Sequence, residues 1–309
     1  MKNILTFFAV FLMFSLTAFA QKENEDEKDF DVDFDDNGFW SDFDEVDWKF
    51  GMFERDAIES VPTIEINYDF AQPKFHEDAY NGDFMMTNGL ETRLGFTEYF
   101  EFEHSPTLIE YDFGYFMLKN FNADYGSNEK DDISDVAVEA WRFGVGNSSG
   151  YGWRLGEKQF IILYHDDGMN WTQLDFQDDA PDSLSQYRLD RFGDSFRFGT
   201  HFSGGIKVRL FHYISLDGGF ERSVVFPRHM FWYWSASELL EAIAHGGTDI
   251  LINEIEKSSP KLVPLVNFIL KNAVSYGAYE LRSKYMNWPV ETAAPFMFDT
   301  YKVGISFQF

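Results

Sequence analysis

The sequence ends with Tyr301-Lys-Val-Gly-Ile-Ser-Phe-Gln-Phe309, a stretch in which apolar and polar side chains alternate. The apolar set is Tyr301, Val303, Ile305, Phe307 and Phe309, and the set between them is Lys302, Gly304, Ser306 and Gln308. Successive side chains of a β-strand point to opposite faces of the sheet, so this period predicts a strand with one apolar and one polar face. A chain built from such strands is expected to be an all-β protein.

The same two-residue period recurs along most of the chain from Thr63 onward. It predicts ten strands, at 62–70, 89–102, 107–117, 136–146, 150–157, 159–165, 169–177, 191–211, 214–226 and 297–309. The short pair 150–157 and 159–165 falls below the roughly 9–11 residues that a membrane-crossing strand needs. Eight or twelve strands are therefore the alternatives to ten.

Composition narrows the kind of all-β fold. Aromatic residues make up 19% of the chain, yet its mean hydropathy is −0.31. A closed antiparallel up-and-down transmembrane β-barrel explains both, because only every second residue of its strands faces lipid. A soluble β-sandwich is the alternative, but its core favours Val, Ile and Leu over the Phe, Tyr and Trp that fill the apolar faces here.

The first twenty residues have the features of a signal peptide. Lys2 is followed by the apolar run Ile4–Phe14 and by Ala18-Phe19-Ala20, so cleavage is expected after Ala20. The chain contains no cysteine, which excludes stabilisation by disulfides. With the signal peptide and the alternating strands, the last strand resembles those of small outer-membrane β-barrel proteins of Gram-negative bacteria. That resemblance implies an outer-membrane location and recognition of Tyr301–Phe309 by the barrel-assembly machinery.

The polar faces of the strands are expected to line one narrow lumen, since a barrel of this size is filled by side chains. The predicted lumen residues are Glu65, Asp69, Glu91, Arg93, Glu110, Asp112, Arg142, Arg154, Arg197, His201, Lys207, Arg209 and Lys302. In 107–117 this assignment turns Tyr111, Phe113 and Tyr115 toward lipid. Opposite charges confined in a lumen are expected to pair, which predicts a plugged barrel. A narrow path for a solute or an ion is the alternative.

One segment, 235–286, has helical and not strand spacing. Ser235 and Glu238 match a capping box, Gly246-Gly247 interrupts the pattern, and a second helix is predicted after Pro260. The strand count places this helical insertion on the extracellular side, as a cap over the barrel end or folded into its mouth. A partner-binding element or a lid is the alternative, and an error of one strand in the count would move the insertion to the periplasmic side.

The segment 21–60 is strongly acidic and has no helical or strand period, so it is predicted to be a largely disordered periplasmic tail. Within it, oxygen-bearing side chains follow the spacing of an EF-hand-type calcium loop: Asp33, Asp35, Asn37, Ser41 and Asp44. Position 12 of the loop is Asp44 where that family has Glu, and no helix is predicted on either side. A solvated acidic tail without calcium is the alternative.

An enzymatic alternative starts from His201-Phe202-Ser203, because residues two apart on a strand share a face. The spacing resembles the His-x-Ser of outer-membrane lipid A deacylases, which implies acyl hydrolysis. Asp217 has the parity to orient the imidazole. The sequence departs from that family in two ways: Gly204 follows the serine where the family has Asn, and the pair is predicted to face the lumen instead of lipid.

The sequence as a whole predicts an outer-membrane barrel, residues 61–309, with a plugged lumen and a non-catalytic envelope or surface-binding role. Its formal net charge of −27 argues against nucleic acid as a partner. The expected partners are outer-membrane lipid, the barrel-assembly machinery and an unidentified envelope or extracellular partner. No cofactor is expected apart from calcium in the tail. Acyl hydrolysis and solute passage stay as alternatives.

Overall fold

The computed structural model of the protein describes residues 57–76, 79–80, 82–102, 105–123, 136–177, 180, 182–193 and 195–309. The described residues all belong to one compact unit, Ala57–Phe309. The predicted signal peptide lies outside the described residues. So do the calcium-loop residues Asp33, Asp35, Asn37, Ser41 and Asp44 and nearly all of the acidic tail.

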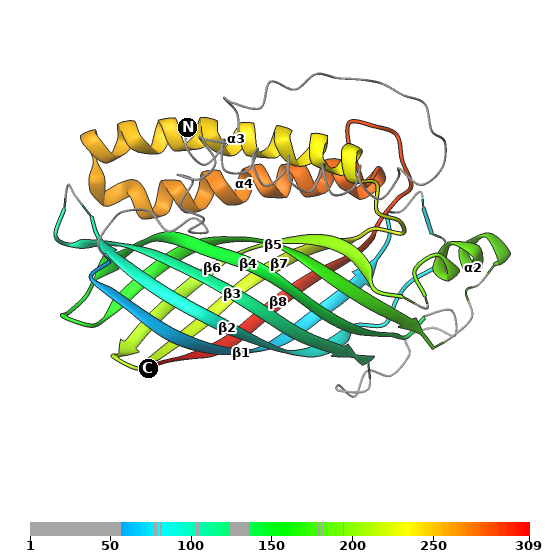
Figure 1. The fold of residues 1–309 in the computed structure, drawn as a ribbon, viewed down its shortest axis with the longest axis horizontal. Helices are drawn as coiled ribbons and strands as arrows, with labels where there is room; N and C mark the ends of the chain where they lie inside the picture. Colours follow the sequence, from blue (N-terminus) through cyan, green and yellow to red (C-terminus); the bar gives the residue numbers. More distant parts are fainter. Residues whose placement is uncertain are drawn as a thin grey trace, which may run out of the picture. The chain divides into compact units, whose positions relative to one another are not determined.

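Eight antiparallel strands form a closed barrel in which each strand pairs with its neighbour in the sequence (Figure 1). They are β1 (Glu59–Lys74), β2 (Thr87–Glu101), β3 (Leu108–Asn122), β4 (Val138–Arg154), β5 (Phe160–Phe176), β6 (Arg197–Phe211), β7 (Ile214–Val225) and β8 (Phe296–Gln308). The last strand closes the barrel by pairing with the first, with Ile66 opposite Ile305. The predicted closed antiparallel up-and-down barrel is confirmed.

The prediction of ten strands is wrong, because two expected turns lie inside strands. Segments 136–146 and 150–157 belong to β4, and segments 159–165 and 169–177 belong to β5. Ser148 and Asp166 stand opposite each other in the ladder between these strands, and both are buried. Polar residues are normally a turn signal, but inside a barrel they also mark strand positions that face a polar lumen.

The two ends of the barrel differ in the length of their connections. The segments 102–107, 155–159 and 212–213 are short, and Glu59 and Gln308, the outer ends of β1 and β8, lie at the same end; we call it the short-turn end. The opposite, long-loop end carries the longer connections and helix α2 (Ser183–Asp190). The carboxylate of Asp182 caps α2 by accepting from the backbone N–H of Ser185 and of Leu184, and these bonds hold the pKa of Asp182 below its ordinary value.

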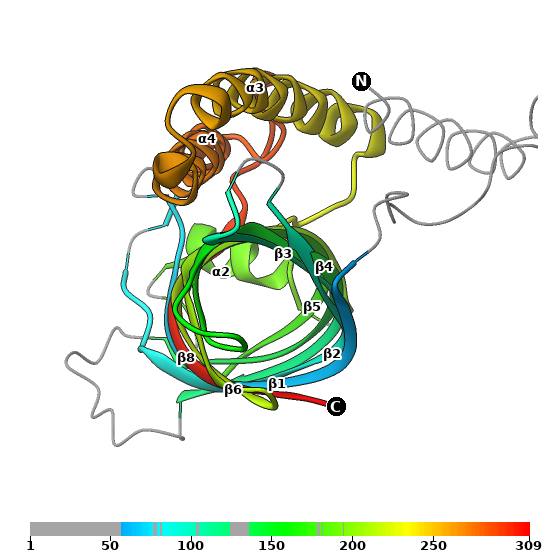
Figure 2. The same ribbon diagram turned by 90° about the vertical axis from the view of Figure 1, so that its left-hand side faces the viewer.

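A helical hairpin joins β7 to β8 and lies along the outside of the barrel wall (Figures 1 and 2). It consists of α3 (Phe231–Ser258), the short helix η2 (Pro260–Leu262) and α4 (Val263–Lys284), and α4 packs against β4, β5, β6 and β7. The end-on view in Figure 2 shows both long helices outside the ring of strands. Within the described residues, no helix is long and apolar enough to cross a membrane.

Two expectations about the helical segment, its placement and its helix boundaries, are wrong. Its place along the wall means that it is neither a cap over the barrel mouth nor folded into it. The first helix begins at Phe231, one turn before the predicted cap, and Ser235 donates its hydroxyl hydrogen to the Phe231 carbonyl within the helix. It also continues through Gly246-Gly247 without a break. Tertiary packing of the hairpin therefore overrides the local start and stop signals.

Candidate functional site

The lumen holds a dense set of charged side chains that are almost completely removed from solvent. The cations are Arg93, Lys119, Arg142, Lys207 and Lys302, and the acids are Glu65, Asp69, Glu91, Asp166, Asp217 and Glu221. No side chain among them is more than 6% exposed. They reach one lumen because every second residue of each strand points inward, and closure brings the strands within side-chain reach of one another.

Glu221 on β7 is the centre of this network. Its Oε1 atom lies 3.1 Å from the Lys119 ammonium and 3.2 Å from the Arg142 guanidinium. Its Oε2 atom lies 3.7 Å from Lys302 and 3.8 Å from Arg93. One carboxylate thus faces four cations from four other strands, so the network connects opposite sides of the barrel.

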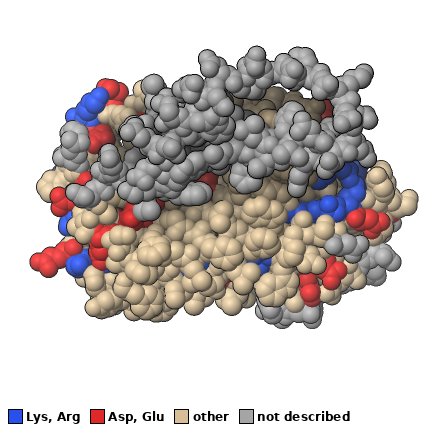
Figure 3. Space-filling view, in the orientation of Figure 1, with Lys and Arg blue, Asp and Glu red and all other residues tan. Residues whose placement is uncertain are grey.

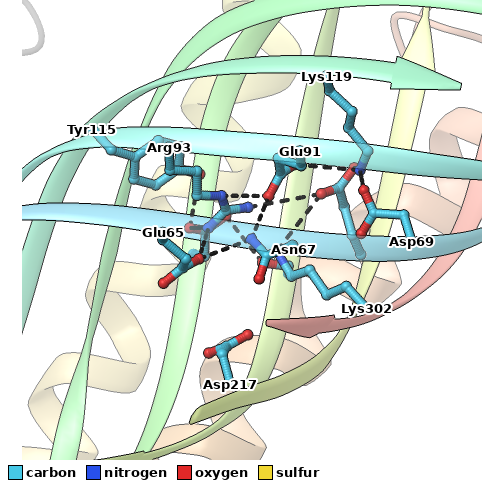
Figure 4. A network of polar contacts seen from close by, with 12 residues as sticks. Glu65, Asn67, Asp69, Glu91, Arg93, Tyr115, Lys119, Asp217 and Lys302 are labelled. Carbon is cyan, nitrogen blue, oxygen red and sulfur yellow. Dashed lines mark hydrogen bonds and ion pairs between the residues drawn. The ribbon is translucent and has the colours of Figure 1, made fainter. Parts of the chain in front are cut away.

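Arg93 on β2 forms a second centre of the network (Figure 4). Its Nε donates to Glu91 at 2.6 Å, and its Nη1 donates to Asp166 at 3.1 Å. The guanidinium also lies over the ring of Tyr115, 4.3 Å from the centroid. Asn67 joins the acids beside it by donating to Glu65 at 3.0 Å and to Glu91 at 2.9 Å. Neutral donors therefore supplement the ion pairs where two acids lie close together.

A third group of contacts extends the network toward the short-turn end. The Lys207 ammonium lies 2.6 Å from Glu65 and donates to the Tyr111 hydroxyl at 2.9 Å. Ser306 also donates to Glu65, at 2.9 Å. Ionised groups removed from water are tolerated only when opposite charges and hydrogen bonds replace their hydration, and these residues have both.

Aromatic and aliphatic side chains close the lumen on both sides of the charged layer. Toward the short-turn end the cluster comprises Tyr99, Ile109, Tyr111, Phe113, Tyr115, Met117, Phe160, Ile162 and Tyr164. Toward the long-loop end Phe121, Val138, Leu174, Phe296 and Phe298 belong to a larger cluster that includes Phe192, just after α2. The lumen is thus filled in three layers, with charges between two apolar plugs.

Most of the predicted lumen residues do face the lumen. Glu65, Asp69, Glu91, Arg93, Arg142, His201, Lys207, Arg209 and Lys302 are all buried there. At the ends of the barrel, Arg209 pairs with Glu59 at 2.9 Å, Arg154 lies over the Phe160 ring, and Arg197 donates to the Gly193 carbonyl. These last three close the edges of the lumen and do not belong to the central network.

Glu110 and Asp112 were placed in the lumen wrongly. Both lie on the outer face of β3, where Asp112 accepts a hydrogen bond from Asn147 of the adjacent strand at 3.1 Å. The aromatic residues between and beyond them, such as Tyr111 and Tyr115, point inward instead. The physical reason is that this narrow lumen is filled partly by tyrosines whose hydroxyls bond to its charges. Lys119 lies further along the inward face of β3, and this buried charged residue indicates which face of the strand lines the lumen.

The residues of the hydrolase alternative have other partners. Ser203 donates to Asp166 at 3.0 Å and accepts from Lys302 at 3.2 Å. The His201 Nε2 atom lies 3.1 Å from the Tyr115 hydroxyl, and Asp217 accepts from Tyr164 at 3.0 Å. Hydrogen bonding thus draws His201, Ser203 and Asp217 into the lumen network. It does not assemble a nucleophile, a base and an orienting acid.

The outer wall away from the hairpin is apolar. The exposed residues there include Ile64, Ile66, Tyr68, Phe70, Leu90, Leu94, Phe96, Phe116, Leu118, Ile206, Leu216, Tyr301 and Val303. Figure 3 shows uncharged surface across the middle of this face, with most of the charged residues gathered at the two ends. A polar row that includes Ser60, Glu98 and Asp112 crosses the wall from the short-turn end. The predicted assembly residues Tyr301, Val303, Ile305 and Phe307 lie on the outer face of β8, and Phe309 directly follows the strand.

The hairpin has polar residues inside and apolar residues outside. Between its helices and the wall it buries Ser237, Thr248, Asn267, Asn272, Ser275, Arg282 and Ser283. Arg282 pairs with Glu241 at 2.7 Å and with Glu238 at 3.1 Å across the two helices. The exposed side of the hairpin carries Leu240, Ile243, Ile250, Leu251, Leu265, Ile269 and Leu281. This distribution matches that of the barrel itself.

Specific contacts seat the hairpin on the wall. The Tyr279 hydroxyl donates to Asp299 of β8 at 2.6 Å, and Trp153 of β4 donates to the Lys261 carbonyl at 3.3 Å. Gly204 lets α4 approach closely, because a Cβ atom there would clash with the Asn272 side chain. The same asparagine accepts a hydrogen bond from His165 of β5, 3.1 Å away.

Comparison with known proteins adds little beyond this geometry. No protein-family model matches the chain, and no curated protein matches it. Among solved structures, Neisserial surface protein A is 8% identical, with 81% of this chain and 99% of that chain covered and a TM-score of 0.35. Ail, the attachment invasion locus protein of Yersinia pestis, is 10% identical, with coverages of 82% and 100% and a TM-score of 0.30. Ail in complex with the heparin analogue sucrose octasulfate gives 12%, the same coverages and the same TM-score.

Proposed function

We propose that the protein is a closed, non-conducting barrel of the outer membrane that acts as a non-catalytic envelope protein. The observation that carries the proposal is the distribution of side chains between the two faces of the barrel. The outer face is apolar over most strands, whereas the inner face carries a paired set of buried charges. Lipid contact on the outside favours this distribution, which would be unfavourable in water.

The hairpin supports the same location. Because it lies along the wall from one end of the barrel to the other, a membrane around the barrel would also surround the hairpin. Its exposed side chains, among them Ile243 and Ile250, suit that environment, and its polar groups bond to one another and to the wall. Mean hydropathy along each helix does not capture this, since the polar groups are buried inside the hairpin.

The lumen argues for a structural role over transport. Ion pairs link opposite sides of the barrel at Glu221 and Arg93, and an apolar cluster lies on each side of the charged layer. A passing solute would have to separate these buried pairs, and a buried charge that loses its partner costs about 3–5 kcal/mol. A sealed barrel is therefore the favoured state.

A partner, if the envelope role includes one, is best accommodated at the long-loop end. The hairpin is engaged with the wall, which leaves the helix α2 (Ser183–Asp190) as an accessible element at that end. A cavity of about 330 Å³ opens there, lined in part by Phe75, Arg188, Arg191 and Tyr285. Binding by this surface is part of the proposal, and its partner belongs to the envelope or the extracellular space.

Two measurements on the purified, refolded protein test the proposal. In planar bilayers we expect no conductance steps above the bare membrane, with a conducting porin as the positive control. The absence of cysteine allows single-site spin labelling, and we expect labels at Val303 and Ile243, which are 55% and 59% exposed, to collide with oxygen in lipid. A label at the lumen residue Thr300 is the matched control. Resolved channel steps would overturn the sealed lumen, and labels accessible to an aqueous relaxant would overturn the membrane location.

A further inference from the structure

A polar site lies between the helical hairpin and the outer wall of the barrel. His165 and Asp167 are adjacent outward positions of β5, and His245 of α3 lies above them. The three side chains each offer a ligand atom, and these atoms lie within 4.8 Å of one another. We propose that His165, Asp167 and His245 bind a divalent transition-metal ion of the zinc type, which fastens the helical hairpin to the barrel wall.

The donor set fits this class of ion. Two imidazole nitrogens and one carboxylate oxygen are ligands that zinc takes with a fourth position left for water. The His165 Nε2 and Asp167 Oδ2 atoms are 2.9 Å apart, close to the roughly 3.3 Å that separates two ligands of a tetrahedral zinc ion. The centroids of the two imidazole rings are 5.3 Å apart, with 36° between the ring planes. The three donor atoms lie within 4.8 Å of one another, so side-chain rotations must draw them closer together to reach one ion.

The hydrogen bonds of His165 indicate where a cation is needed. The Asn272 Nδ2 atom donates to the Phe268 carbonyl, which leaves its Oδ1 as the atom that faces the His165 Nδ1 atom at 3.1 Å. Nδ1 must therefore carry a hydrogen, because an amide oxygen can only accept. The Nε2 atom of a neutral ring then presents a lone pair to the Asp167 carboxylate, and two acceptors repel at 2.9 Å. A cation between them removes that repulsion.

This arrangement of His165 matches that of metal-bound histidines. Such a histidine usually donates its other ring N–H to an oxygen acceptor, which fixes the tautomer and the direction of the ligand lone pair. Asn272 is the oxygen acceptor here, and Gly204 leaves the space that its side chain needs beside His165. The residue that holds the first ligand in place therefore comes from α4, on the same hairpin that the ion would fasten.

His245 supplies the link to α3. Its Nε2 atom lies 3.0 Å from the Ser275 hydroxyl and 3.7 Å from Glu241. Its Nδ1 atom is buried and has no hydrogen-bond partner among the residues that the structure describes. A buried ring nitrogen without a partner is costly unless a ligand satisfies it. Asp167 is 57% exposed, so the hairpin does not cover the site completely.

The ion would complete an attachment that packing leaves one-sided. α4 packs along β4 to β7, whereas α3 lies mainly against α4 and meets the wall near its start, where the Trp234 ring is 5.1 Å from the Phe198 ring. A metal bound by two barrel residues and one α3 residue would connect the outer helix directly to the wall. The chain has no cysteine, so a metal bridge is a crosslink that it can form where a disulfide cannot.

Zinc binding to the untagged, refolded barrel tests the inference directly. The protein is stripped with a chelator, titrated with Zn²⁺ against a chromophoric competitor, and assayed for bound metal per chain. We expect one ion per barrel and a higher melting temperature with zinc. Loss of a residue that orients a metal ligand lowers metal affinity about 10–100-fold, so His165→Ala and His245→Ala are expected to weaken binding at least about 100-fold, and Asn272→Ala about 10–100-fold.

The matched control is His229→Ala, because His229 precedes α3 and contacts Phe198 and Trp234 away from the site. It should bind zinc like the wild type. Asp167→Asn retains the shape of the site and serves if either histidine variant does not refold, as judged by heat-modifiable gel mobility. The inference is overturned if the wild type shows no saturable zinc binding, or if His229→Ala and the site variants lose it equally. In that case a proton on His165, and not a metal, separates the two acceptors.

Discussion

The lumen and the contact region between the hairpin and the outer wall both bury polar groups beneath an apolar exterior, but with different chemistry. We call this contact region, which includes Tyr279, Asn272 and His245, the hairpin seat. In the lumen, Lys and Arg from several strands meet Asp and Glu from others, and Glu221 alone faces four cations. At the seat, the contacts to the wall are mostly those of hydroxyls, an amide and imidazoles, such as Tyr279, Asn272 and His245. Ion pairs between strands dominate the lumen, whereas at the seat neutral hairpin side chains bond to the wall, in part to its acids such as Asp299.

The difference follows from how each region is assembled. Lumen residues are brought together by barrel closure itself, since all eight strands contribute to one continuous ring of hydrogen bonds. The hairpin instead packs on the outside of the wall through side-chain contacts, without strand pairing. Loss of a lumen charge should therefore destabilise the whole barrel, whereas a change at the seat should mainly loosen the hairpin. Substitutions in each region distinguish these outcomes.

The largest effect is expected for Glu221→Gln. Among the described residues, Glu221 is the one carboxylate within ion-pair distance of Arg142 and of Lys302, so the substitution leaves two buried cations without an acid. Breaking a buried ion pair from one side costs about 3–5 kcal/mol. We expect a loss of this size in the free energy of unfolding, measured by urea titration with tryptophan fluorescence in lipid vesicles.

The matched control for this change is Glu98→Gln on the outer face of β2, where the carboxylate accepts from Ser60 at a partly exposed position. Surface substitutions of this kind usually change stability by less than about 0.5 kcal/mol. If the two variants lost equal stability, the lumen network would not be the element that holds the barrel closed, and the lumen would not differ from the hairpin seat in this respect.

A medium effect, confined to the hairpin, is expected for Gly204→Leu. The new side chain would occupy the space of the Asn272 amide and push α4 away from β6. Overpacking of a close contact costs about 1–3 kcal/mol, here at the seat and not in the barrel. We expect faster protease cleavage of 231–284 with little change in the urea midpoint of the barrel.

Gly218→Leu provides the comparison, because Gly218 is an outward position of the neighbouring strand where an added Cβ atom would have no other atom within 4 Å. Its hairpin should be cleaved at the wild-type rate. Cleavage that accelerates equally in both variants would indicate a general loosening of the wall and would contradict the proposed role of Gly204 as the point of closest approach.

The strand period could be predicted from sequence because lipid and lumen impose opposite demands on neighbouring residues. For β1, β2, β6 and β8 the predicted faces are correct, including Arg93, Lys207 and Lys302 in the lumen. The assignment of β3 failed because Tyr111 and Tyr115 fill the lumen as hydrophobic bodies with hydroxyls bonded to Lys207 and Asp166. Aromatic content alone cannot distinguish a lipid-facing ring from one that plugs a narrow barrel.

The acids at the centre of the network, Asp166 and Glu221, could not be predicted from the strand patterns. Asp166 resembles part of a turn beside Gly168. Glu221 faces the lumen from β7, but the cations of β2, β3 and β4 reach it only because the barrel closes. The same holds for the hairpin seat: His165 and His245 are far apart in the sequence, and nothing local indicates that they meet. Residues brought together by docking of separate elements leave no spacing signal in a single sequence.

The smallest effect expected is that of Tyr279→Phe, which removes one hydrogen bond between α4 and β8. Asp299 keeps its contacts with Lys74 at 2.6 Å and Arg222 at 3.3 Å, so no buried charge is stranded and the loss should stay near about 1 kcal/mol. Tyr276→Phe, one turn earlier and at a residue that is 48% exposed, should leave the stability of the hairpin unchanged. Hydrogen exchange of α4 amides is the suitable readout, because it reports opening of the hairpin while the barrel stays folded. Protection that falls in α4 but not in β8 for the first variant would show that the hairpin opens independently of the barrel. Equal loss in both elements would mean that barrel and hairpin unfold as one unit.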